Sequence, residues 1–123
     1  MKIQSHRELI VWQKAMDAAM QVFEVTGRFP VEERYSLTDQ MRRSSRSVAA
    51  QIAEGWRRRR YRAAFVNKFS EAEGEAAETQ THVEIARRCG YLSDDIAHEL
   101  DAVYEEIISM LVSMSKNAEK WTP

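Results

Sequence analysis

One long amphipathic pattern sets the architecture of this chain: RAAFVNKFSEAEGEAAETQTHVEIARRC, from Arg62 to Cys89. Small and apolar residues recur in it at alternating steps of four and three positions, namely Phe65, Phe69, Ala72, Ala76, Thr79, Val83 and Ala86. A seven-residue repeat of this kind forms a seam along one side of a helix and favours nearly parallel packing against other helices. Gly74 lies within the pattern. Because glycine costs about 1 kcal/mol relative to alanine in a helix, we expect another backbone to approach closely there.

The residues that follow predict a second helix of the same kind, from 93 to about 117. Its apolar seam consists of Ile96, Leu100, Val103, Ile107, Met110 and Met114. Gly90 suits the C-terminal cap of the preceding helix, and Ser93 suits the N-terminal cap of this one because its hydroxyl can accept a backbone hydrogen bond. The repeat fades after Lys116, so the tail AEKWTP is expected to fray.

Two further helices are predicted earlier in the chain, at about 6–27 and 36–56. The helix at 36–56 has an apolar stripe of Leu37, Met41, Val48, Ile52 and Trp56. Gly27 and Pro30 separate the two helices, since glycine favours a helix end and proline cannot continue a helix. Four amphipathic helices with short links predict an all-α fold: an antiparallel up-and-down four-helix bundle formed by one domain, residues 1–123.

The composition excludes several classes of protein. With 123 residues, 44% hydrophobic residues, 4 Gly and 2 Pro, the chain is long enough for one core and has few irregular segments. No apolar run reaches the roughly 20 residues that a membrane span needs, and the first residues lack the apolar core of a signal peptide. The one cysteine, Cys89, cannot form an internal disulfide. We therefore expect a cytoplasmic protein with no membrane partner.

The helix at 6–27 has two apolar stripes, which is more than one core requires. One stripe consists of Leu9, Trp12, Met16, Ala19, Met20 and Phe23, and the other of Val11, Ala15, Ala18, Val22 and Val25. Together they cover roughly 220° of the helix circumference. We predict that the bundle covers one stripe and another copy of the chain covers the other, and we assign the stripe from Val11 to Val25 to this oligomer interface. A central helix in one compact core is the alternative.

Residues 41–62 concentrate positive charge. They contain one acid, Glu54, and eight arginines, Arg42, Arg43, Arg46, Arg57, Arg58, Arg59, Arg60 and Arg62. The chain has 18 Lys plus Arg and 19 Asp plus Glu, so this segment carries +7 and the remainder carries 10 minus 18, or −8. Arginine forks suit phosphate groups, and the nearby Trp56 and Tyr61 suit single-stranded RNA or DNA because they can stack on bases. The cluster therefore predicts a surface that binds the backbone of RNA or DNA.

Two alternatives remain for the charged residues. The arginines can pair with the acidic faces of the helices at 62–89 and 93–117, in the same chain or in a neighbouring copy, which would leave a scaffold that binds another protein and no nucleic acid. Glu78 with His82, or Asp94 or Asp95 with His98, could supply two ligands to a metal, but a catalytic site usually has three protein ligands. The sequence shows no phosphate loop, nucleophile motif or paired Glu-x-x-His motif. We therefore predict no catalytic residues, no metal and no cofactor.

Three segments indicate a family: LIVWQKA at Leu9–Ala15, FPVEERYSLTDQMRRSSRSVAAQIAEG at Phe29–Gly55, and RRCGYLS at Arg87–Ser93. In these segments the chain resembles the four-helix bundle proteins encoded by intervening sequences in bacterial 23S ribosomal RNA genes. The resemblance implies a homo-oligomer, typically a pentamer, with no established enzymatic activity. The accessory variability determinants of diversity-generating retroelements look similar in fold, and they contact nucleic acid and a reverse transcriptase. In the run Ser47–Gln51 the chain lacks the proline and asparagine of many relatives, so no helix kink is expected there.

Overall fold

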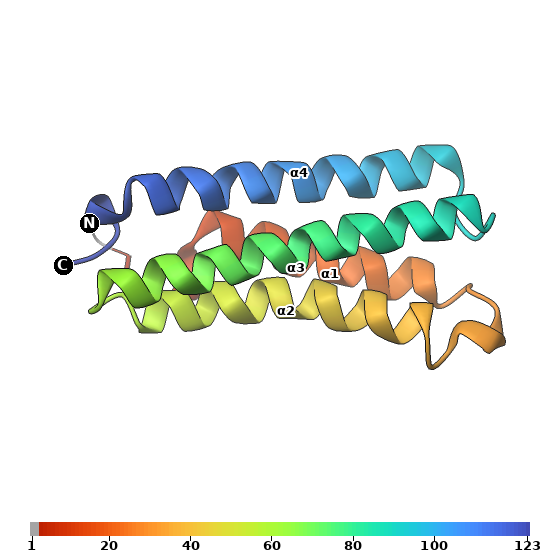
Figure 1. Cartoon of the computed structure of the whole chain (residues 1–123), viewed down its shortest axis with the longest axis horizontal. Coiled ribbons are helices and arrows are strands. Elements are labelled where there is room, and N and C mark those ends of the chain that lie inside the picture. The colour runs from red at the N-terminus through yellow and green to blue at the C-terminus, as the bar shows by residue number, and fades with distance from the viewer. Residues whose placement is uncertain (1–2) are drawn as a thin grey trace.

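The computed structural model describes residues 3–123, whose long elements are four helices. These are α1 (Ile10–Thr26), α2 (Leu37–Arg57), α3 (Arg62–Arg88) and α4 (Asp94–Lys116). Three short 3-10 helices accompany them, η1 (His6–Glu8), η2 (Val31–Glu33) and η3 (Ala118–Lys120), and the described residues contain no strand. Figure 1 shows the four long helices side by side, with α2 and α4 returning toward the end where the termini lie. The all-α fold class predicted from the sequence is confirmed.

The seam predicted for α3 faces the core along the whole helix. All seven of its residues are buried: Phe65, Phe69, Ala72, Ala76, Thr79, Val83 and Ala86. The stripe predicted for α2 is buried too. The buried surfaces of the two helices also share a polar contact, because Ser44 Oγ and Thr79 Oγ1 lie 2.8 Å apart in a hydrogen bond. The spacing of apolar residues therefore predicted the inner faces of α2 and α3 correctly.

The tightest glycine in the α2–α3 packing is Gly55 and not Gly74. A Cβ at Gly55 would lie 2.8 Å from Cδ1 of Phe69, whereas a Cβ at Gly74 would have no described atom within 4 Å outside its own backbone. The prediction for Gly74 is wrong because this residue lies on the exposed side of α3, opposite the seam. Gly55 instead allows the last turn of α2 to pack directly on Phe69.

The two stripes of α1 are exchanged relative to the prediction. The residues assigned to the oligomer interface are buried or, for the last of them, half-buried within the chain itself: Val11, Ala15, Ala18, Val22 and Val25. The stripe that stays open includes Met16, Met20 and Phe23, which are 38%, 59% and 46% exposed. Both stripes are apolar, so hydrophobicity alone could not rank them. The small side chains of Ala15 and Ala18 let α1 approach the other helices closely, which places their stripe in the core.

The last helix and the tail cover the core differently from the prediction. The buried residues of α4 are Ala97, Leu100, Tyr104, Ile107, Leu111 and Met114. Three residues of the predicted seam are only half-buried, Ile96, Val103 and Met110, because the buried stripe runs through the adjacent positions Ala97, Tyr104 and Leu111 instead. The tail, predicted to fray, forms η3 with Ala118 buried, and Arg62 Nε donates a hydrogen bond of 3.1 Å to Thr122 Oγ1. Contacts with the core and with α3 therefore hold the tail.

Candidate nucleic-acid interface

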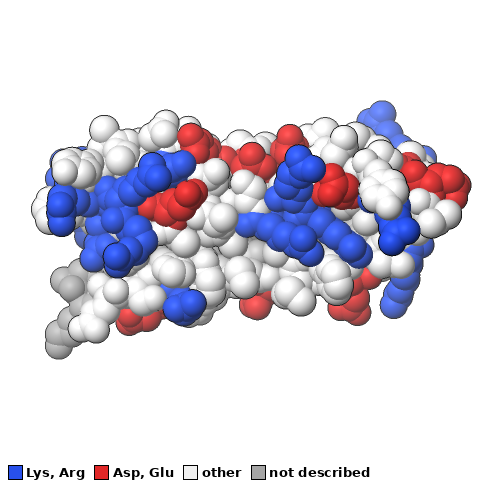
Figure 2. All heavy atoms as spheres, turned by 90° about the horizontal axis from the view of Figure 1, so that it is seen from below, with Lys and Arg blue, Asp and Glu red and all other residues white. Residues whose placement is uncertain are grey.

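The eight arginines form two groups, which we call the basic ridge (Arg42, Arg43 and Arg46, on α2) and the basic turn (residues 57–62, from the last residue of α2 to the first of α3). Figure 2 shows a face of the molecule on which basic side chains gather at one end and in a second group nearer the middle. The helix rise of 1.5 Å per residue puts Arg46 about 16 Å from Arg57 along α2. A ligand must therefore be extended to contact both groups.

Two arginines of the basic ridge are engaged within the chain. Arg42 Nε donates to Thr26 Oγ1 at 2.9 Å, and its guanidinium carbon lies 4.6 Å from the ring centroid of Phe23. Arg43 forms an ion pair of 2.9 Å with Asp39, one turn earlier in α2. Arg46 is exposed and makes no ion pair with residues 3–123. In the basic ridge, the guanidinium group of Arg46 is therefore free to bind a ligand, whereas those of Arg42 and Arg43 already contact described residues of the chain.

The basic turn is a tight, hydrogen-bonded connection. The backbone N–H of Arg58 donates to the carbonyl of Glu54 at 3.0 Å, and that of Tyr61 donates to the carbonyl of Arg58 at 3.0 Å. Arg59 folds back over the turn: its guanidinium carbon lies 4.0 Å from the ring centroid of Trp56, and its Nη1 donates to the carbonyl of Trp56 at 2.8 Å. These contacts fix the backbone from which the remaining arginines project.

Three arginines of the basic turn are exposed and make neither an ion pair nor a side-chain hydrogen bond with any described residue: Arg57, Arg58 and Arg60. Arg62 is exposed too, but it donates a hydrogen bond to Thr122. Glu54, the one acid among residues 41–62, forms an ion pair with Lys68, whose Nζ lies 3.8 Å from Glu54 Oε2. The first turn of α3 contains no acidic residue, so the positive end of its helix dipole adds to the potential of the turn. The turn therefore presents concentrated positive charge to solvent.

The acidic side chains of α3 and α4 that form ion pairs do so with bases outside the basic ridge and the basic turn. Glu84 accepts hydrogen bonds of 2.8 Å from Arg87 Nη2 and from Arg88 Nε, and these bonds lower its pKa from an ordinary 4.5 to about 2. Glu106 of α4 pairs with Lys14 of α1 at 3.0 Å. Within the described chain, no arginine of residues 41–62 pairs with an acid of α3 or α4. The internal pairing considered from the sequence is therefore not what neutralises these arginines in a single chain.

The two aromatic residues of the predicted site differ completely in exposure. Trp56 is 2% exposed, with its ring in the core and under Arg59, so it has no free face for a ligand. Tyr61 is 66% exposed and is the residue immediately before α3. The structure thus keeps Tyr61 beside the exposed arginines and removes Trp56 from the surface.

The groups considered as metal ligands do not assemble further. His82 Nε2 and Glu78 Oε2 lie 4.0 Å apart. The pKa of the neighbouring Glu75 is raised, first by burial of its carboxyl group and then by the negative charge of Glu78. Among residues 3–123, no three His, Cys, Asp or Glu side chains come close enough to hold a metal ion. In the same range, no helix has the length and hydropathy of a membrane span.

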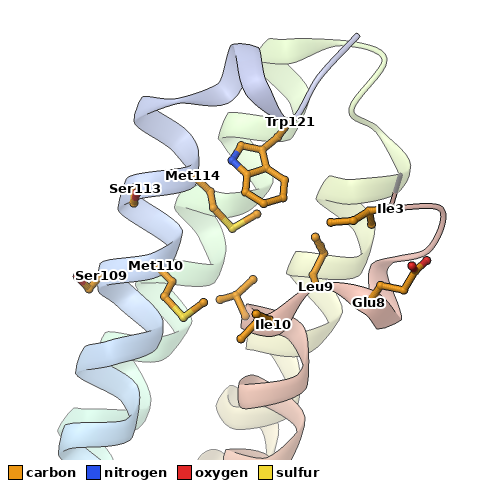
Figure 3. A pocket seen from close by; sticks show the side chains of 10 residues that line it. Ile3, Glu8, Leu9, Ile10, Ser109, Met110, Ser113, Met114 and Trp121 are labelled. Atoms are coloured by element: carbon orange, nitrogen blue, oxygen red, sulfur yellow. The ribbon is translucent and has the colours of Figure 1, made fainter. Parts of the chain in front are cut away.

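An apolar pocket of about 440 Å³ lies between the beginning of α1 and the end of α4. Figure 3 shows Met110, Met114 and Trp121 pointing toward Leu9 and Ile10 across this pocket. The pocket could not be predicted from the sequence, because its lining residues come from opposite ends of the chain and one of them, Trp121, lies in the tail that was expected to fray. It lies at the same end of the bundle as the basic turn (Figure 1).

Fold and charge distribution together define the class of this protein: a four-helix bundle whose basic surface follows α2 and the turn into α3. The chain belongs to the family described as 23S rRNA-intervening sequence protein, because the family model matches residues 7–113. It is also similar to a protein with unknown function from the S23 ribosomal protein family of Bacteroides thetaiotaomicron VPI-5482, whose crystal structure is known. That match has a TM-score of 0.80 and 27% identity, and it covers 87% of this chain and 99% of the other. No curated protein matches the chain. The family resemblance seen in the sequence is confirmed.

Proposed function

We propose that this chain is a non-enzymatic protein that binds the phosphate backbone of RNA or DNA through its basic turn. The observation that carries the proposal is the exposure of Arg57, Arg58 and Arg60 without any ion pair among residues 3–123. Unpaired guanidinium groups bind phosphates through paired hydrogen bonds and gain free energy from the release of counterions. Arg46 is also exposed, so the binding surface continues along α2 and an extended polyanion can contact both Arg46 and the basic turn.

The test compares two variants that lose the same charge. In the first, Arg57, Arg58 and Arg60 are changed together to Gln. In the matched control, Arg28, Arg34 and Arg88 at the other end of the bundle are changed to Gln. For a single strand each phosphate contact adds about 0.7 to the slope of log affinity against log salt, so the first variant should lose about 2 units of slope and the control none. Equal slopes and affinities for the first variant and the unchanged protein would contradict the proposal.

The proposal also includes self-association into a homo-oligomer, with the pentamer that the family resemblance implies. It is supported by the open stripe of α1, where Met16, Met20 and Phe23 leave apolar surface exposed to water. In light scattering during size-exclusion chromatography we expect a mass near five chains of 14.3 kDa, and a lower mass for Met20→Glu. Val31→Glu is the control, because Val31 is 74% exposed in η2 and lies outside the stripe.

The second candidate function is a scaffold that binds another protein, and it is favoured by the same open stripe. A monomeric mass that is unchanged by Met20→Glu, in a protein that does not bind RNA or DNA, would favour the scaffold. Apolar contact with a protein should survive moderate salt, whereas phosphate binding should not. The cytoplasm is the proposed location for either function, because the single cysteine, Cys89, is exposed and free.

A further inference from the structure

The aromatic ring of Tyr61 is exposed and has no aromatic or cationic partner among the described residues. The side chain is 66% exposed, and it makes no hydrogen bond, aromatic contact or cation–π contact with residues 3–123. Its backbone is held on both sides, because its N–H donates to the Arg58 carbonyl at 3.0 Å and its carbonyl accepts from the N–H of Phe65 at 3.1 Å. The ring therefore projects from a fixed point of the chain.

The surroundings of this ring are positively charged. Arg58 and Arg60 are exposed beside it in the turn, and Arg62 follows it at the beginning of α3. Arg62 donates from Nε to Thr122 Oγ1, which leaves the other guanidinium nitrogens without a partner among the described residues. An aromatic face among guanidinium groups can take a base while the arginines take the phosphates on either side of it.

A second exposed tyrosine lacks these surroundings and serves as a comparison. Tyr35 is 85% exposed at the other end of the bundle, where Glu32 and Glu33 precede it and Asp39 follows it. The guanidinium carbon of Arg34 lies 5.5 Å from its ring centroid. Tyr35 therefore matches Tyr61 in residue type and exposure, but not in charge.

We infer that the basic turn binds single-stranded nucleic acid, with Tyr61 stacking on an unpaired base while the neighbouring arginines contact its flanking phosphates. The inference rests on the proposed phosphate binding and adds the class of nucleic acid. In a duplex both faces of each base are covered by neighbouring base pairs, so a side chain on the backbone side cannot stack on them. Stacking tolerates any base, which agrees with the lack of a motif for reading base edges.

The experiment measures the affinity of the full chain for three ligands of equal length: a single-stranded oligonucleotide, its duplex, and a strand with the same phosphates whose central nucleotides are abasic. The variants are Tyr61→Ala, Tyr61→Phe and the control Tyr35→Ala. Thermal unfolding of each variant is followed by circular dichroism, so that a change in affinity is compared only between folded proteins. Tyr61 contributes no packing to the core, so Tyr61→Ala should fold.

Loss of one stacked base lowers affinity roughly 5- to 150-fold, and we expect a loss in this range for Tyr61→Ala with the single strand. Tyr61→Phe keeps the ring and should bind like the unchanged protein, as should Tyr35→Ala. The abasic strand should bind the unchanged protein and Tyr61→Ala with equal affinity. Equal binding of the single strand by Tyr61→Ala and the unchanged protein would overturn the inference, as would a preference for the duplex.

The same measurements separate this inference from the proposed function. One outcome is that the unchanged protein binds all three ligands with equal affinity and that changing Arg57, Arg58 and Arg60 together to Gln abolishes this binding. In that case the basic turn binds phosphates, and the stacking inference is wrong. If none of the three ligands binds at low salt, the proposed function itself is wrong, and the inference fails with it.

Discussion

The guanidinium carbon of Arg59 lies 4.0 Å from the ring centroid of Trp56, and Nη1 of the same arginine donates to the Trp56 carbonyl at 2.8 Å. One arginine of the basic turn thus acts within the fold, where it covers the edge of the core and holds the end of α2. Arg57, Arg58 and Arg60 are exposed, and they project from the backbone that this contact helps to fix. A run of four consecutive arginines, Arg57 to Arg60, therefore contains two kinds of residue.

Replacement of Arg59 by Ala should reduce stability, whereas replacement of Arg60 should not. A cation–π contact on a partly desolvated Trp and a charge-assisted hydrogen bond together predict a loss of about 1–3 kcal/mol in the free energy of unfolding for Arg59→Ala. Arg60→Ala, on the exposed surface, should change it by less than about 0.5 kcal/mol. Urea denaturation measures both values. Equal stabilities of the two variants would show that the Arg59–Trp56 contact has no net energetic weight.

Alanine at the two α-helical glycines should have opposite effects. At Gly55 a Cβ would lie 2.8 Å from Phe69 Cδ1, and we expect Gly55→Ala to cost about 1–3 kcal/mol because the packing must shift. At Gly74 a Cβ meets nothing, and alanine should raise stability by up to about 1 kcal/mol because it favours the helix. The midpoints of denaturant unfolding give the comparison. A stabilising Gly55→Ala would contradict the tight packing of α2 on α3.

The hydrogen bond between Ser44 and Thr79 predicts a measurable loss when one partner is removed. Ser44 and Thr79 are 1% and 0% exposed, so Ser44→Ala should lower the free energy of unfolding by about 1 kcal/mol. Ser70→Ala on the exposed side of α3 is the control and should be neutral or slightly stabilising, because alanine is the better helix former. A Ser44→Ala protein as stable as the control would show that the hydroxyl pair contributes nothing net.

Glu84 should stabilise the protein in a pH-dependent way. Its pKa in the folded state is about 2, below the ordinary 4.5, because the carboxylate accepts hydrogen bonds from Arg87 and Arg88. The folded state therefore favours the ionised form, and this stabilisation is complete above pH 4.5 and is lost as the pH falls toward 2. Glu84→Gln should have a lower Tm than the unchanged protein at pH 7, and the difference should disappear near pH 2. A difference that stays constant with pH would exclude this electrostatic cause.

The helices and their inner faces could be predicted from the sequence because periodicity reports local geometry. A residue that recurs every three or four positions must lie on one side of a helix, whatever the rest of the chain does. For this reason Phe65, Thr79 and Val83 were correctly placed in the core, and the hydroxyl of Ser93 accepts the predicted N-terminal hydrogen bond from Ile96 at 3.2 Å. The concentration of arginine was equally visible, since it needs only counting.

The assignment of individual site residues depended on tertiary contacts between distant segments. Hydrophobicity could not choose between the two stripes of α1, and the seam of α3 gave no sign that Gly55, not Gly74, meets a neighbouring side chain. Composition treated Trp56 and Tyr61 alike, but the packing of α2 buries one ring and leaves the other in solvent. Local patterns in the sequence were enough to predict four amphipathic helices and one basic segment. Which arginines stay free could not be predicted in this way, because it depends on partners such as Phe23 and Thr122 that lie far away along the chain.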